Sequence, residues 1–174
     1  MNTIDHKNLP EILFEANQIA QSAGLKILEI YETDFSVVKK DDNSPLTLAD
    51  TEAHKIICES LSKLTPSIPI LSEESSHIDF SERSRWSQYW LVDPLDGTRE
   101  FIKKNGEFTV NIALVDGNKP ILGVVYVPVS ETSYIATINY GAHKSVKEND
   151  LKKISVRKAD INNITVAGSR SHGN

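Results

Sequence analysis

Two segments near the N-terminus repeat apolar residues at helical spacing. The first extends from Pro10 to about Glu32, and its apolar side chains return every three or four residues. Asn8 stands where an N-cap is expected, and proline is tolerated in a first helical turn. The second segment extends from Thr47 to about Leu64. The pattern therefore predicts two amphipathic helices, each with one buried face.

Most of the remaining chain shows the shorter period of strands, with β-branched and aromatic residues alternating with polar ones. The triplet Asp116-Gly117-Asn118 predicts a hairpin turn. Strands are expected at 35–38, 68–71, 89–92, 108–115, 121–127, 133–138, 143–146, 153–156 and 164–167, and an irregular segment at 76–87. Helices followed by consecutive hairpin strands predict an α+β fold, with two long N-terminal helices packed on a largely antiparallel sheet.

Composition narrows the class of protein. The 174 residues are 39% hydrophobic and 25% charged, which is typical of a globular domain with its own core. The net charge of −5 gives no indication of nucleic-acid binding, which requires a basic surface. The single cysteine, Cys58, excludes an internal disulfide and lies on the apolar face of the second helix. Because no signal peptide or membrane-spanning run is visible, we expect a cytoplasmic protein.

The residues that suggest chemistry follow the strand at 89–92, in the hexapeptide Asp93-Pro94-Leu95-Asp96-Gly97-Thr98. Its two carboxylates, with the Leu95 carbonyl between them, can face one point from either side. Mg²⁺ prefers such oxygen ligands. The backbone amides of Gly97 and Thr98, at the start of a helical turn, can bind an anion. The hexapeptide thus predicts a metal and phosphate site.

Two further carboxylates are candidates for the same site. Glu73 follows the buried strand at 68–71, although a solvated turn would also explain it. If the two strands are neighbours, three carboxylates converge, which is unfavourable without a cation. Asp50 could accept the proton of a water that Thr98 orients, or it could simply form a capping box with Thr47. Together these groups predict metal-assisted hydrolysis of a phosphate ester.

Three ordered motifs carry a family resemblance. They are residues 40–50 (KDDNSPLTLAD), Glu73-Glu74-Ser75, and the hexapeptide that starts twenty positions after Glu73. With them the chain resembles the lithium-sensitive, magnesium-dependent phosphatases related to inositol monophosphatase. The segment 98–114 is most similar to the bacterial 3′(2′),5′-bisphosphate nucleotidase branch of that family.

The resemblance implies a role for each matching residue. The implied Mg²⁺ ligands, for two or three ions in a complete enzyme, are Glu73, Asp93, the Leu95 carbonyl and Asp96. The implied catalytic pair, which activates the water, is Asp50 and Thr98. The implied substrate-binding residues are Gly97, Thr98, Glu73, Ser169 and His172.

The implied reaction removes the 3′-phosphate of adenosine 3′,5′-bisphosphate. An inositol or sugar phosphate as substrate remains an alternative, as does a non-catalytic fragment. The family fold is an αβαβα sandwich whose second α/β domain supplies another metal-binding aspartate. We therefore expect residues 1–158 to form the first domain and residues 159–174 to form the opening strand and turn of the second. Weak or absent activity is expected for this chain, with possible self-association through the uncovered domain face.

Overall fold

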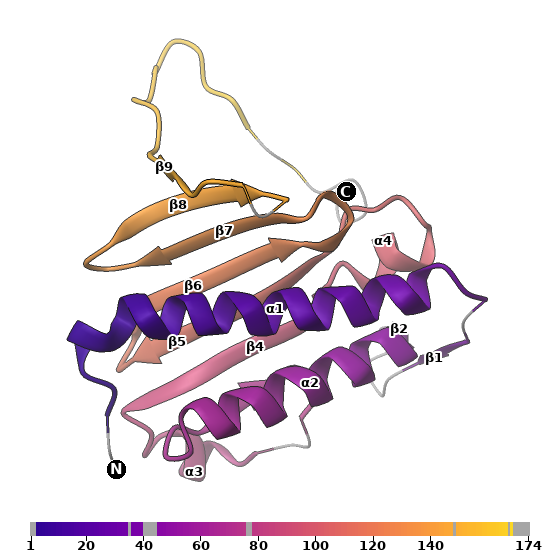
Figure 1. Cartoon of the computed structure of the whole chain (residues 1–174), viewed down its shortest axis with the longest axis horizontal. Helices are drawn as coiled ribbons and strands as arrows, with labels where there is room; N and C mark the ends of the chain where they lie inside the picture. The colour runs from indigo at the N-terminus through magenta and orange to yellow at the C-terminus, as the bar shows by residue number, and fades with distance from the viewer. Residues whose placement is uncertain are drawn as a thin grey trace.

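Two long helices lie side by side across one face of a seven-stranded sheet (Figure 1). The computed structural model describes residues 3–34, 36–39, 45–75, 78–147, 149–166 and 168. The helical elements are η1 (His6–Asn8), α1 (Leu9–Tyr31), α2 (Leu48–Leu64), α3 (Phe80–Arg83), α4 (Thr98–Ile102) and η2 (Pro128–Ser130). The strands are β1 (Val37–Lys39), β2 (Pro45–Thr47), β3 (Ile70–Ser72), β4 (Gln88–Asp96), β5 (Thr109–Asp116), β6 (Lys119–Val127), β7 (Thr132–Thr137), β8 (Gly141–Val146) and β9 (Lys152–Ile154).

The sheet follows the chain in the order β3-β4-β5-β6-β7-β8-β9. Only β3 and β4 pair in parallel, and every later pair is antiparallel. The predicted α+β class and the largely antiparallel sheet are therefore confirmed. The segment between β3 and β4 was expected to be irregular throughout, but it contains the helical turn α3.

The two long helices begin in different ways. At α2 the Thr47 hydroxyl accepts from the Ala49 N–H at 3.2 Å, and the Asp50 carboxylate accepts from the Thr47 N–H at 2.8 Å. This is the predicted capping box. At α1 Asn8 occupies the expected N-cap position, but its side chain makes no capping hydrogen bond. Asp5 instead accepts from Lys7 N–H and caps the preceding turn η1.

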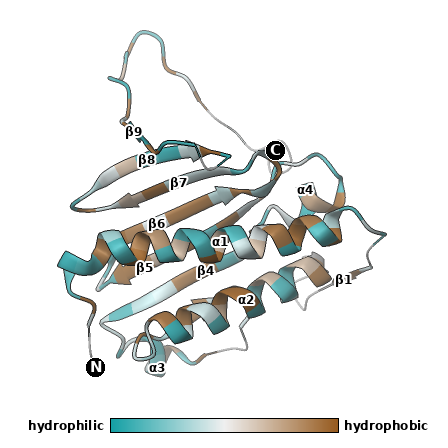
Figure 2. Cartoon of the chain, in the orientation of Figure 1, coloured by the Kyte–Doolittle hydropathy of each residue, from teal (hydrophilic) through white to brown (hydrophobic). Residues whose placement is uncertain are grey.

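The core lies between the helices and the near face of the sheet. Alternate residues of β4, β5 and β6 point into it, among them Trp90, Val92, Ile112, Leu114, Leu122 and Val124. The Trp90 indole N–H donates to Thr65 Oγ1 at 2.8 Å, which satisfies the one polar atom of a fully buried ring. Figure 2 shows the same division in hydropathy, with hydrophobic bands along α1, α2 and the central strands.

The opposite face of the sheet is only partly covered. Leu91, Val125 and Tyr134 keep 45%, 41% and 37% of their surfaces exposed. The strand pairings put them on the face away from the helices, because side chains alternate along a strand. These three residues define the open face of the sheet.

The C-terminal segment departs from the prediction. No strand forms at 164–166, the described part of the expected strand 164–167. Ile164 and Val166 are 72% and 82% exposed. A strand is stable only when its backbone groups pair with a neighbour, and no described strand lies against this segment. No described helix is both long and apolar enough to cross a bilayer.

Candidate active site

The strand that was expected at 89–92 continues into the central hexapeptide as far as Asp96, and its end is bulged. Asp93 pairs with Asn111 and Asp96 with Thr109, and the register shifts between these two pairs. A bulge redirects side chains at the end of a strand. Gly97 then takes a φ of +97°, and a Cβ there would lie 2.9 Å from the Glu107 carbonyl oxygen. Only glycine fits this junction, after which α4 begins at Thr98.

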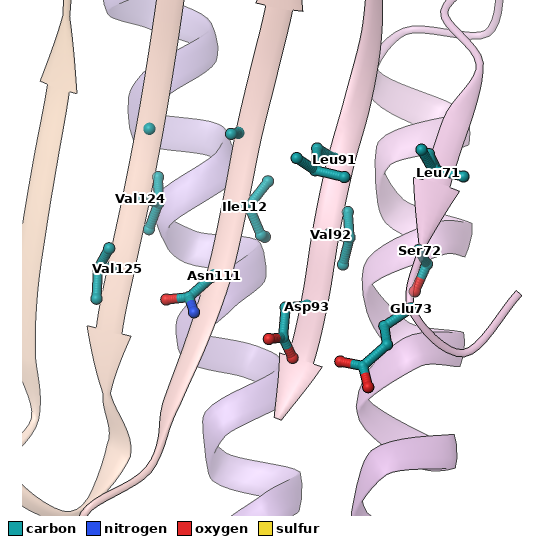
Figure 3. Close-up of a pocket in the computed structure, with 12 residues that line it drawn as sticks. Leu71, Ser72, Glu73, Leu91, Val92, Asp93, Asn111, Ile112, Val124 and Val125 are labelled. Carbon is teal, nitrogen blue, oxygen red and sulfur yellow. The ribbon is translucent and has the colours of Figure 1, made fainter. Parts of the chain in front are cut away.

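Glu73 and Asp93 meet at the carboxyl ends of the two parallel strands. The Glu73 N–H donates to the Val92 carbonyl oxygen at 3.0 Å, so β3 stays paired up to its last residue. Figure 3 shows the two carboxylates pointing toward each other. The strands are neighbours, as the sequence argument required.

The surroundings of Asp93 favour its protonated form. Burial, the charges of Glu73 and Asp96, and a hydrogen bond with Glu73 raise the pKa of Asp93 to about 7. One carboxylate oxygen, Oδ1, is buried without a hydrogen-bond partner among the described residues. A buried oxygen without a donor, beside two like charges, is stabilised by a bound cation.

Thr98 connects Asp50 to the same site. Its hydroxyl oxygen lies 3.1 Å from Asp50 Oδ1 and 3.2 Å from the Leu95 carbonyl oxygen. A hydroxyl has one proton, so it can donate to only one of these acceptors at a time. The acceptor oxygen that does not receive the Thr98 proton remains available to a water proton or a cation. The structure thus brings Asp50 to Thr98 and Leu95, although Asp50 lies 48 positions before Thr98 in the sequence.

The two carboxylate oxygens of Asp50 have different partners, one at the helix cap and one at the site. Its Oδ2 accepts from the N–H and the hydroxyl of Thr47 at 2.8 and 2.6 Å, while Oδ1 faces Thr98. Burial raises the pKa of Asp50, and the hydrogen bonds from Thr47 and Thr98 oppose that shift. The two alternatives for Asp50, capping residue and proton acceptor, are therefore geometrically compatible.

Asn111 is a site residue that the sequence argument missed. Its Nδ2 donates to Asp96 Oδ2 at 3.1 Å, and its Oδ1 accepts from the Thr109 hydroxyl at 3.2 Å. This chain of hydrogen bonds orients Asp96 from the neighbouring strand. Asparagine is depleted in strands, so an Asn inside the apolar run of β5 was the available signal.

The carboxylates are suitable ligands for a hard cation, although they do not form a complete set of metal ligands. Among the residues that the structure describes, no three His, Cys, Asp or Glu side chains are close enough to hold a metal. The orphaned Asp93 Oδ1 and the adjacent Glu73 fit Mg²⁺, which usually takes few protein ligands and completes its shell with water and phosphate. Ser169 and His172 lie outside the described residues.

A hollow of about 480 Å³ extends from the carboxylates over the open face. Glu73, Asp93 and Asn111 line one end, and Leu91 and Val125 lie along its floor (Figure 3). The site is therefore accessible from the side of the sheet that the helices do not cover.

Comparison with known proteins places the chain in a family. The model of the inositol monophosphatase family matches residues 8–174. The chain belongs to the inositol monophosphatase family. A family relative from Escherichia coli, the 3′(2′),5′-bisphosphate nucleotidase CysQ, is 48% identical over 163 residues, which are 92% of this chain and 64% of the relative. CysQ of Buchnera aphidicola is 45% identical over 176 residues, with coverage of 100% and 63%.

A solved structure of the family agrees with this assignment. CysQ from Bacteroides thetaiotaomicron superposes with a TM-score of 0.71 at 41% identity, covering 86% of this chain and 59% of that one. The chain therefore spans less than two thirds of the length of the inositol monophosphatase family members that it matches. The resemblance read from the three motifs is confirmed.

Proposed function

We propose that the chain carries the water-activating and metal-binding part of a magnesium-dependent phosphomonoesterase. The observation that carries the proposal is the Thr98 hydroxyl, which lies within 3.2 Å of both Asp50 and the Leu95 carbonyl, next to the Glu73–Asp93 pair. Glu73, Asp93, Asp96 and the Leu95 carbonyl would hold two or three Mg²⁺ ions. When bound, Mg²⁺ supplies positive charge that offsets the charge of the phosphate as its ester bond breaks.

The residues of the chain then have separate tasks. Thr98 Oγ1 orients a water, and Asp50 takes a proton from it through the hydroxyl. The water oxygen forms a bond to phosphorus, the ester P–O bond breaks, and the leaving oxygen takes a proton from solvent. The amides of Gly97 and Thr98 hold the phosphate oxygens at the start of α4. Glu73, Ser169 and His172 would contact the rest of the substrate.

The proposed substrate is adenosine 3′,5′-bisphosphate, whose 3′-phosphate would leave to give AMP. The support is the 45–48% identity to nucleotidases named CysQ. An inositol or sugar phosphate is the second candidate, because the matched family is named for inositol monophosphatase. The reducing cytoplasm is the proposed location, which suits the free thiol of Cys58.

A phosphate-release assay with Mg²⁺ tests the proposal on a panel of esters. We expect faster release from adenosine 3′,5′-bisphosphate than from inositol 1-phosphate; the reverse order would favour the second candidate.

Turnover should be slow, because the described part of the chain gathers no three-carboxylate cluster. A kcat of ~1–100 s⁻¹, ordinary for phosphoryl-transfer enzymes such as kinases, would contradict that expectation. No Mg²⁺ binding by calorimetry, with self-association, would support a non-catalytic fragment.

A further inference from the structure

A partly buried hydrogen bond joins α2 to the last residue of β3. His54 Nδ1 lies 2.8 Å from Ser72 Oγ, and Ser72 is only 4% exposed. The two residues are far apart in the sequence, and neither belongs to the motifs that define the site. Ser72 directly precedes the proposed metal ligand Glu73.

The backbone at Glu73 is fixed from three sides. The His54 ring contacts the preceding side chain, and the Glu73 N–H donates to the Val92 carbonyl oxygen at 3.0 Å. On the other side, the Ser75 N–H donates to the Ser72 carbonyl oxygen at 3.0 Å. The Glu73 side chain is exposed at a strand end, so these contacts determine where its carboxylate can reach.

The helix α2 therefore contacts both strand ends of the site. Asp50 bonds to Thr98, just after β4, and His54 bonds to Ser72 at the end of β3. Residues four apart lie on one face of a helix, about 5–6 Å from each other. One face of α2 thus contacts the chain next to Glu73 and the chain just after β4, while the hydrogen bonds between β3 and β4 fix the spacing of the two strands.

We propose that His54 is a positioning residue, which acts through Ser72 to place the Glu73 carboxylate for Mg²⁺. The inference rests on the proposed function. A ligand on a mobile strand end loses conformational entropy when it binds a metal, and a hydrogen bond from its support reduces that loss. Cys58 Sγ lies 3.6 Å from the same His54 nitrogen. Burial raises the pKa of the Cys58 thiol, so this neighbour stays protonated and packs beside the ring.

The test compares four variants of the full chain by Mg²⁺ calorimetry and thermal unfolding. His54→Phe removes the hydrogen bond but keeps a ring, and we expect Mg²⁺ affinity to fall roughly 10- to 100-fold, the usual loss when a partner of a metal ligand is removed. His54→Asn, whose amide can replace Nδ1, should recover most of that loss. Ser72→Ala should match His54→Phe. Ile57→Val, a fully buried position on the same helix, should lower thermal stability without changing the affinity.

Two further readouts separate positioning from stability. The double variant His54→Phe/Ser72→Ala should bind Mg²⁺ no more weakly than either single variant, because both remove one interaction. Without metal, the Glu73 amide should exchange hydrogen faster in His54→Phe than in the unmodified chain. Equal Mg²⁺ affinity in His54→Phe and Ile57→Val would overturn the inference and leave the proposed function standing. No Mg²⁺ binding by the unmodified chain would overturn both.

Discussion

At the scale of single residues, Asp50 and Asp93 are both carboxylates with raised pKa values but have different surroundings. Asp50 accepts hydrogen bonds from Thr47 and Thr98, which offset part of its burial. Asp93 has a buried oxygen without a described partner and two neighbouring carboxylates. The first environment suits a proton acceptor and the second a cation ligand.

Substitution of Asp50 tests its role as proton acceptor. We expect Asp50→Asn to lower turnover roughly 10²–10⁴-fold, the usual contribution of general base catalysis. Thr47→Ala is the matched comparison, because it removes the hydroxyl that caps α2 and donates to Asp50 Oδ2 but leaves the Asp50 carboxylate and its Thr98 contact in place. It should lower stability by about 1 kcal/mol and lower turnover far less than Asp50→Asn. Equal loss of turnover in both variants, measured as phosphate release, would mean that Asp50 acts only as a cap.

Substitution of Asp93 tests the electrostatic argument through pH. Because the pKa of Asp93 is raised from 3.8 to about 7, the metal-free folded chain holds more protons than the unfolded chain between these values. This contribution to stability is therefore present at low pH and lost as pH rises toward 7. Asp93→Asn should remove it, so the variant should be the more stable one at pH 8 without metal. Thermal unfolding at pH 5 and pH 8 measures the difference.

The same variant should lose its response to Mg²⁺. At a concentration 100 times its dissociation constant, a ligand that binds only the folded state adds about 2.7 kcal/mol. For a chain of this size that is roughly 5–10 °C in Tm. We expect such a shift at pH 8 for the unmodified chain, a smaller one at pH 5, where protons compete, and none for Asp93→Asn. A full Mg²⁺ shift in the variant would remove Asp93 from the ligand set.

At the scale of elements, close packing between α1 and β6 explains a glycine inside a helix. A Cβ at Gly24 would lie 2.4 Å from Tyr126 Cε1 and 3.2 Å from Pro128 Cγ. The helical period alone gives no reason for a glycine at this position. It could not predict the contact, because the opposing ring comes from a strand about a hundred residues later.

Because of the Gly24 contact, we expect the usual preference of a helix for alanine over glycine to be reversed at this position. In an open helix, Gly→Ala stabilises by about 1 kcal/mol, but here the added methyl group meets Tyr126. We expect Gly24→Ala to destabilise by about 1–3 kcal/mol, as overpacked cores do. Ser22→Ala, at an exposed position of the same helix, should be neutral or slightly stabilising. Chemical denaturation measures both, and a stabilised Gly24→Ala would contradict the close packing.

At the scale of the whole molecule, the helices cover one face of the sheet and leave the other partly open. The strand pairings align Asp93, Val125 and Tyr134 on that open face, and the same row continues to Lys144 and Lys152. This row is thus acidic at its β4 end and basic at its β8 and β9 end, with Asn111, Val125 and Tyr134 between them. Such a face can pair with a second copy in the opposite orientation.

The open face predicts self-association of this chain. Sedimentation should show a concentration-dependent dimer that high salt weakens, because exposed charge pairs are screened. Leu91→Asp places a charge on the open face and should shift the chain to monomer. Leu25→Asp, at an exposed position of α1, is the control and should leave the dimer intact. A chain that stays monomeric at all concentrations would contradict the expectation.

The sequence alone determined the features that depend on neighbouring residues. Periodicity located α1 and α2, the Thr47–Asp50 spacing predicted the capping box, and the Asp116-Gly117-Asn118 turn predicted the hairpin of β5 and β6. The three motifs identified the family, because they combine residue types that only a metal and phosphate site needs together. The family assignment needed no coordinates.

Only the tertiary structure decided how distant residues meet. It aligned β3 with β4 so that Glu73 faces Asp93, and it placed Asn111 against Asp96. It also showed that residues 164–166, the described part of the strand expected at 164–167, have no described neighbouring strand. It also showed His54 holding Ser72. Local patterns carry the preferences of a residue for helix, strand or turn. Pairing between strands and contact between a helix and a sheet depend on which surfaces bury each other, and that is a property of the folded chain.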